Sequence, residues 1–325
     1  MKKVLRSLFI AIVAAVLCAG GWCYLALTEK KPYSTVLEIR GDAPLIRSLA
    51  PLPFARSLPF RLYLKALRNG GKGIKAGWYE ISGEKSVIDI IDMLEKGMDR
   101  IFRLTIPEGR TVAEVVKQLE ADGRIDRARF AEVLSKRGES FPYLTPGGNF
   151  EGYFYPETYY LTEKATEEII IDTLLREFLK RFPPENYPDK EDFYRKLILA
   201  SILEREARVA DEKKLMASVF YNRIKKGMKL ASDATVNFVF GYEKKRILYK
   251  DLEVDSPYNT YKYEGLPPAP ICNPDAASVD AAFHPADTEF LFFVARGDGG
   301  HFFSKTYREH IRFQNEQRKA NSSKK

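Results

Sequence analysis

Leu199-Ala200-Ser201-Ile202-Leu203-Glu204-Arg205-Glu206 places two glutamates at the end of an otherwise apolar run. Asp189 and Asp192 precede the run with the spacing of a helix cap, so the stretch predicts a helix beginning at Asp189. A glutamate among apolar side chains loses hydration, which disfavours its charged form and lets it hold a proton near neutral pH. Such a group can act as a general acid, so we expect the chemistry of this chain on this helix.

The periodicity of the run leaves open which glutamate carries that chemistry. Glu204 shares a helical face with Leu197 and Ala200, whereas Glu206 shares another face with Ile202. Many helical glutamates are simply solvated or paired, because helices tolerate Glu well.

Short motifs surround this helix in a defined order. They are residues 106–109 (IPEG), 150–159 (FEGYFYPETY), 200–206 (ASILERE), 217–223 (ASVFYNR), 232–236 (SDATV), 256–261 (SPYNTY), 265–268 (GLPP), 284–286 (HPA) and 299–304 (GGHFFS). Together they closely resemble the MltG (YceG-like) family of endolytic murein transglycosylases, over nearly the whole chain from about Lys31 onward.

The resemblance implies an enzyme that cleaves the MurNAc-GlcNAc bond within peptidoglycan glycan strands, and a membrane anchor would place it at nascent strands. It implies Glu204 as the catalytic acid and base, with Glu206 supporting it or pairing with Arg205 or Arg208. One carboxyl group suffices for this reaction. It protonates the glycosidic oxygen and then takes a proton from the C6 hydroxyl of the muramic sugar, which attacks C1. The product is a 1,6-anhydro-MurNAc end.

Five further residues are predicted to bind the substrate. Glu151 could lead into a cleft, or instead bond to backbone N–H groups. Asp233 could orient a sugar hydroxyl, or cap the next helix. Tyr258 and Asn259 offer a flat ring and an amide, although aromatic residues also fill cores. His301 follows two glycines and could donate to a peptide or sugar oxygen.

Composition and spacing argue against several other kinds of chemistry and partner. No histidine pair has zinc-site spacing and no serine lies in a Gly-x-Ser-x-Gly elbow, so we predict no metal and no cofactor. Of the three cysteines only Cys272 lies outside the N-terminal segment, so no disulfide is expected in the rest of the chain. The net charge of +8 comes from interleaved basic and acidic residues. That pattern suits an anionic membrane surface or wall polymer and does not predict a nucleic-acid partner.

The N-terminus predicts a membrane anchor. Residues 8–27 carry no charge and follow Lys2, Lys3 and Arg6. The run is long enough to span a bilayer and exceeds the apolar part of a typical signal peptide. The positive flank predicts that residues 1–7 are cytoplasmic and that the remainder lies on the outer, periplasmic side of the bacterial cytoplasmic (inner) membrane.

The rest of the chain predicts an α+β fold in two parts. Residues 28–148 repeat a strand, turn and helix, and the resemblance implies LysM-like modules there that either bind glycan or act as a spacer. Residues 149–325 place helices before short strands and are predicted to form the catalytic transglycosylase domain. Strands are expected at 36–39, 77–81, 102–106 and 290–295, and helices at 86–97, 111–123, 166–182 and 211–226, with two more beginning at Pro44 and near Ala234.

Two other functions remain open from the sequence. The first is a muramidase that hydrolyses the same polymer, using Glu204 with Glu151 or Asp233. The second is a non-catalytic, wall-binding scaffold that recruits peptidoglycan synthases through its N-terminal modules. Synthases are candidate partners of the transglycosylase as well.

Overall fold

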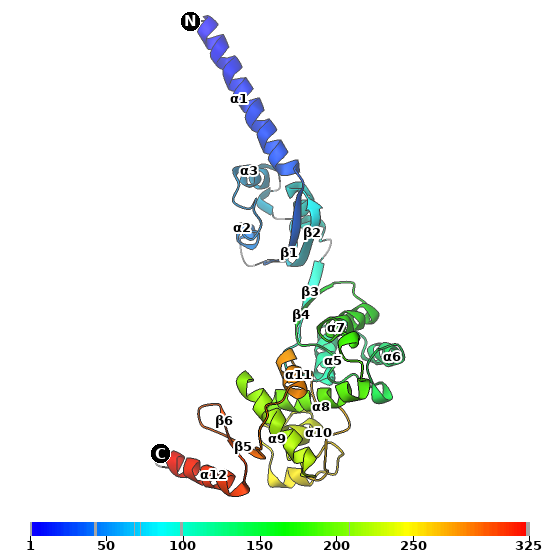
Figure 1. Cartoon of the computed structure of the whole chain (residues 1–325). Helices are drawn as coiled ribbons and strands as arrows, with labels where there is room; N and C mark the ends of the chain where they lie inside the picture. Colours follow the sequence, from blue (N-terminus) through cyan, green and yellow to red (C-terminus); the bar gives the residue numbers. More distant parts are fainter. Residues whose placement is uncertain are drawn as a thin grey trace. The chain divides into compact units, whose positions relative to one another are not determined.

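The computed structural model describes residues 2–41, 44–67, 69–71, 73–97, 100–207 and 209–322. They form two compact units (Figure 1). The first unit is Met1–Leu104 with Tyr159–Lys164, and the second is Thr105–Thr158 with Ala165–Lys325. Helices and short antiparallel strands occur together, so the predicted α+β class is confirmed.

The first unit begins with a long apolar helix, α1 (Lys2–Thr28). Its segment Arg6–Thr28 has 23 residues and is long and apolar enough to cross a membrane. The large apolar side chains from Leu8 to Val16 are exposed, whereas Leu27 is buried in the core of the unit. The anchor predicted at residues 8–27 therefore lies within this helix.

A four-stranded sheet and three helices build the remainder of the first unit. The strands are β1 (Lys31–Ile39), β2 (Gly77–Lys85), β3 (Arg100–Thr105) and β4 (Thr158–Thr162), adjacent in that order, and the helices are α2 (Leu45–Ser48), α3 (Leu58–Leu67) and α4 (Val87–Lys96). The β1–β2 register brings Leu37 opposite Tyr79, and both side chains are buried. Helix α4 begins at a capping box of Ser86 and Asp89 and ends at Gly97, as its sequence predicts. The assignment of these strand–helix pairs as LysM-like stays a prediction.

The third predicted strand–helix pair is divided between the units. Strand β3 pairs with β2 in the first unit, whereas helix α5 (Val112–Ala121) belongs to the second. The capping box of Thr111 and Glu114 at the start of α5 is confirmed. The compact units therefore do not divide at the predicted limit between residues 148 and 149.

The second unit is mainly helical. Its helices are α5, α6 (Arg127–Arg137), α7 (Glu167–Arg181), α8 (Lys190–Glu206), α9 (Lys213–Lys225), α10 (Asp233–Val239), α11 (Ala276–Phe283) and α12 (Tyr307–Ser322), and its strands are β5 (Phe292–Ala295) and β6 (His301–Ser304). Short 3₁₀ turns complete the chain: η1 (Asn69–Gly71) in the first unit, and η2 (Pro146–Gly148), η3 (Pro184–Asn186), η4 (Ala210–Glu212) and η5 (Tyr249–Glu253) in the second.

Helix α8 is the central helix of the second unit. Its N-cap, Asp189, accepts hydrogen bonds from the backbone N–H groups of Glu191 and Asp192, as the sequence predicts. It packs against α9, α10 and α11 (Figure 1). Every residue from Leu197 to Leu203 is buried, because α8 is covered on all sides. Its last turn, which carries Glu204 and Glu206, therefore emerges from a rigid core.

The aromatic motif at residues 150–159 contributes largely to that core. Tyr153 and Phe154 are fully buried. The Tyr153 ring meets the Phe178 ring of α7 at a centroid distance of 5.0 Å and stacks on Tyr143 at 6.4 Å, and Tyr143 in turn stacks on Phe193 of α8 at 4.1 Å. These rings hold the motif and α8 together, so most of the motif serves packing.

Gly152, within the same motif, allows the chain to pass close to α8. Its φ is +92°, and a Cβ there would lie 2.9 Å from Pro270 and 3.2 Å from Leu197 Cδ2. We expect Gly152→Ala to lower the free energy of unfolding by about 2 kcal/mol or more, through strain and overpacking. Gly123→Ala is the matched control, because Gly123 has a φ of +65° in open space and should lose only about 1 kcal/mol. Denaturant unfolding of both variants checks this, and equal losses would contradict the close approach.

Candidate active site

Glu204 lies in a buried cluster with a lysine, an aspartate and a serine. Its Oε2 accepts from Ser278 Oγ at 2.7 Å, from the Asp275 backbone N–H at 3.0 Å and from Lys213 Nζ at 3.2 Å. Lys213 Nζ also donates to Asp275 Oδ1 at 2.8 Å. The side chains of Glu204 and Lys213 are only 10% and 8% exposed. The poorly hydrated acid that the sequence predicts is present at this position.

The charges in this cluster favour a proton on Glu204. Two carboxyl groups share one ammonium group, so ionising both would leave an unbalanced negative charge in a poorly hydrated site. Lys213 lies closer to Asp275 than to Glu204, and Asp275 also accepts the Ser278 backbone N–H at 2.6 Å. The structure therefore favours Asp275 as the carboxylate and Glu204 as the acid.

The pKa directions of the two carboxyl groups agree with that assignment. Burial raises the pKa of Glu204 and the negative charge of Asp275 raises it further, which outweighs the opposing effects of Ser278 and Lys213. Burial also acts to raise the pKa of Asp275, but its hydrogen bonds from Lys213 and the Ser278 backbone lower it overall. Two adjacent carboxyl groups whose pKa values are driven apart are typical of acid–base sites.

Hydrogen bonds along residues 271–273 explain how Asp275 reaches the end of α8. Ser201 Oγ accepts the Ile271 N–H at 2.9 Å, and Cys272 Sγ donates to the Ser201 carbonyl at 3.2 Å. Asn273 accepts the Phe154 N–H through Oδ1, and its carbonyl accepts the Gly109 N–H at 3.0 Å. The motifs at 106–109, 150–159 and 200–206 therefore meet around one segment, residues 271–275.

Glu206 lies beside a second, separate set of groups. Ser232 Oγ donates a short hydrogen bond to its Oε1. Burial raises the pKa of Glu206, while the bonds from Ser232 and the Ala234 backbone lower it and the charge of Asp233 raises it. Glu206 is thus a second poorly hydrated acid, but no lysine pairs with it among the described residues. Arg208, one of its predicted partners, lies outside those residues.

Glu151 is engaged by the backbone. Both its oxygens accept the Val112 N–H, at 3.0 and 3.1 Å, at the start of α5. Burial raises its pKa to about 8 against these bonds. This is the backbone-bonded alternative that the sequence left open.

The loop at residues 256–261 has two distinct roles. Asn259 is fully buried, and its amide stabilises the loop by donating to the Leu252 and Val254 carbonyls at 2.8 Å. Tyr258 packs on Phe238 with a centroid distance of 4.8 Å and stays partly exposed.

Asp233 and His301 are held by side-chain partners. Asp233 is exposed at the first position of α10, whose N-cap is Ser232, and it accepts from Tyr261 OH at 2.7 Å. His301 Nδ1 lies 2.6 Å from Glu212 Oε2, and its backbone N–H donates to the same carboxylate. Asp233 lines the same pocket as Glu206.

A basic pocket of about 350 Å³ lies next to Glu206. The residues that define it are Arg205, Glu206, Asp233, Asn237, Lys245 and Arg246. Arg205 donates to the Gly109 carbonyl at 3.2 Å, and a Cβ on Gly109 would lie 3.9 Å from Glu204 Cγ. One backbone position therefore contacts both the basic pocket and the Glu204 cluster.

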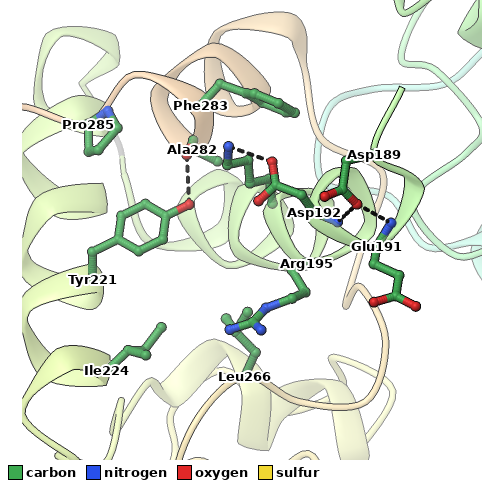
Figure 2. Close-up of a pocket in the computed structure, with 11 residues that line it drawn as sticks. Asp189, Glu191, Asp192, Arg195, Tyr221, Ile224, Leu266, Ala282, Phe283 and Pro285 are labelled. Atoms are coloured by element: carbon green, nitrogen blue, oxygen red, sulfur yellow. Dashed lines mark hydrogen bonds and ion pairs between the residues drawn. The ribbon is translucent and has the colours of Figure 1, made fainter. Parts of the chain in front are cut away.

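A larger pocket, of about 550 Å³, lies along the N-terminal half of α8. Figure 2 shows Tyr221 hydrogen bonded to the Ala282 carbonyl, with Asp189 and Asp192 at the start of α8. Arg195 of this pocket precedes Glu204 by nine residues, or roughly 13 Å along a helix. The pocket is therefore distant from the acid and does not belong to the candidate active site.

Three residues of the Glu204 cluster are missed by the sequence reasoning. Lys213 lies in a run of charged residues that resembles a solvated surface. Asp275 and Ser278 have the spacing of a helix N-cap before an Ala- and Val-rich run, and that signal could have located the start of α11. Their proximity to Glu204 depends on the tertiary fold and has no local signature.

The fold and the Glu204 cluster define the class of protein. It is an α+β protein with an apolar N-terminal helix, in which a buried glutamate contacts an ion pair of lysine and aspartate. Within this class, the chain belongs to the YceG-like family, whose model matches residues 45–316. The family predicted from the motifs is thereby confirmed.

Named relatives and a solved structure agree with this family. The chain is 34% identical to the endolytic murein transglycosylase of Bacillus subtilis (strain 168) over 273 residues, covering 77% of this chain and 74% of that protein. It is 30% identical to the endolytic murein transglycosylase of Streptococcus pneumoniae serotype 2 over 274 residues, 74% of this chain but half of that protein. A crystal structure of a YceG-like protein from Listeria monocytogenes aligns with a TM-score of 0.62 at 30% identity, covering 86% of this chain and 98% of that one.

Proposed function

We propose that this chain is an endolytic murein transglycosylase in which Glu204 is the general acid and base. The names of the relatives support the substrate class and the reaction. The assignment of Glu204 rests on the ion pair between Lys213 and Asp275 beside Glu204 Oε2. Because Lys213 balances the charge of Asp275, we expect the proton of the cluster on Glu204.

In the first step, protonated Glu204 gives its proton to the glycosidic oxygen as the bond to C1 breaks. The carboxylate that forms is stabilised by Lys213 Nζ, Ser278 Oγ and the Asp275 N–H, which already point at Oε2. In the second step, that carboxylate takes the proton of the C6 hydroxyl, whose oxygen attacks C1. The proton returns to Glu204, no water is consumed, and a 1,6-anhydro-MurNAc end results.

Glu206 is the alternative acid, and the surroundings of the two glutamates favour Glu204. A general acid must become a carboxylate during the reaction, and Glu204 has an ammonium group and two hydrogen-bond donors directed at one oxygen. Glu206 has Ser232 and the Ala234 backbone, without a lysine among the described residues. We assign Glu206 a supporting role beside the basic pocket.

The location follows from the N-terminal sequence. Helix α1 would anchor the protein in the cytoplasmic membrane, with Lys2, Lys3 and Arg6 on the cytoplasmic side and the second unit outside. Such an anchor suits an enzyme acting on nascent strands, and peptidoglycan synthases are the partners it would meet there.

Mass spectrometry of the products tests the reaction type. We expect the purified full chain, incubated with peptidoglycan in detergent, to release fragments ending in 1,6-anhydro-MurNAc. These are lighter by one water than the reducing ends that a muramidase leaves. Reducing ends alone would support hydrolysis, and intact strands would support the scaffold.

A further inference from the structure

The basic pocket beside Glu206 is not used by the two steps proposed above. Three of its residues are cationic, Arg205, Lys245 and Arg246, against the two acids Glu206 and Asp233. Even with both acids ionised, positive charge is in excess. Its volume of about 350 Å³ falls within the range of small-ligand sites.

Arg205 is held in position at the edge of this pocket. Its guanidinium carbon lies 3.8 Å from the centroid of the Tyr242 ring, and one N–H donates to the Gly109 carbonyl. A guanidinium has five N–H donors, and this is its one hydrogen bond within the described residues. A stacked, partly satisfied arginine is well suited to bind a carboxylate.

Lys245 and Arg246 add two exposed cations. Within the described part of the chain neither forms an ion pair, and their charge remains available to a ligand. Asp251, the nearby buried carboxylate, is instead bonded to Lys244.

Asn237 provides a second, independent indication of a ligand. Its Nδ2 donates to the Lys244 carbonyl at 3.0 Å, whereas its buried Oδ1 has no hydrogen-bond partner. A buried acceptor without a partner is unfavourable, so a ligand N–H would be favoured at Asn237 once the pocket wall opens enough to expose Oδ1. A phosphate ion has acceptors but no amide N–H, whereas a peptide offers both an N–H and a carboxylate.

We infer that the basic pocket binds an acidic peptide carried by the glycan. Arg205, Lys245 and Arg246 hold its carboxylates, and Asn237 receives an amide N–H. This inference rests on the proposed function, because the muramic units of murein carry short peptides with free carboxylates. Gly109 contacts Arg205 and lies against Glu204, so a peptide held in the pocket would fix its muramic sugar relative to the acid.

A direct binding experiment tests the pocket without relying on cleavage. The full chain in detergent is titrated by calorimetry with the short acidic peptide released from murein by an amidase. We expect the Lys245→Glu, Arg246→Glu double variant to bind at least about tenfold more weakly, since it replaces two cationic hydrogen-bond donors with carboxylates that repel the peptide. Arg195→Glu is the control for charge reversal at another place, because it reverses one cation in the larger pocket and should bind like the wild type. Inorganic phosphate should not compete.

Assays of glycan cleavage then distinguish a failure of this inference from a failure of the proposed function. We expect kcat/KM to be higher on glycan strands that keep their peptides than on strands from which the peptides have been removed. The double variant should lose this preference because its KM for the peptide-bearing strands rises. Absence of cleavage on both substrates would contradict the proposed function only. The inference is overturned if the wild type does not bind the peptide, if phosphate displaces it, or if Arg195→Glu weakens binding equally.

Discussion

Glu204→Gln is expected to lower the rate of glycan cleavage by about 10²–10⁴-fold, since a glutamine can neither give nor take a proton. The substitution keeps the size of the side chain and its contact with Ser278. Folding and membrane association should therefore be unchanged. Cleavage is measured as the release of soluble fragments from peptidoglycan, at equal amounts of folded protein.

Glu206→Gln is the matched control for that variant. It makes the same chemical change two residues away on the same helix, at a carboxyl group bonded to Ser232. We expect less than about a tenfold loss, because a supporting residue contributes less than the proton donor. A larger loss in Glu206→Gln than in Glu204→Gln would reverse the assignment, and full activity in both would favour the scaffold.

Asp275→Asn is expected to move the alkaline limit of activity to lower pH. A general acid with a raised pKa is active while protonated, so activity is present at low pH and is lost as the pH rises through that pKa. The charge of Asp275 helps to raise the pKa of Glu204, and without it Lys213 would pair with Glu204. Asparagine is a good N-cap, so α11 should remain intact. On the alkaline side of the wild-type profile we expect kcat/KM to fall roughly tenfold or more.

Lys213→Met should move the alkaline limit of activity to higher pH. Lys213 lowers the pKa of Glu204, so its removal raises that pKa and extends activity to higher pH. The maximal rate should also fall, because the proton is then shared with Asp275 and no ammonium group stabilises the Glu204 carboxylate. Rate profiles against pH for both variants check these signs. If the alkaline limits of both variants moved in the same direction, the proposed effects of Asp275 and Lys213 on the pKa of Glu204 would be contradicted.

The local elements of this protein were predictable, whereas the assembly of its site was not. The capping residues Ser86, Thr111 and Asp189 correctly placed the starts of α4, α5 and α8 because a cap acts within one helical turn. The membership of β4 in the first sheet has no counterpart in the predicted elements, since this strand begins at residue 158 and returns to pair beside β3. That pairing is long-range and leaves no periodic signal in the sequence.

The site shows the same division between local and tertiary information. The apolar run before Glu204 correctly predicted a poorly hydrated acid, because that property follows from the helix itself. Lys213, the first residue of α9, and Asp275, the N-cap of α11, set the charge of the cluster and reach Glu204 only through the tertiary fold. Glu151 and Asn259 have residue types that glycan sites use, but their atoms are occupied by backbone partners.

The central claim is that Glu204 keeps its proton in the folded protein. An infrared difference spectrum between the wild type and Glu204→Gln, recorded across a pH series, isolates the carboxyl group of this residue. We predict a protonated carboxyl band that persists above the ordinary glutamate pKa of 4.5 and then disappears as the pH rises. A band that is already lost at or below that value would show an ionised Glu204 and contradict the account.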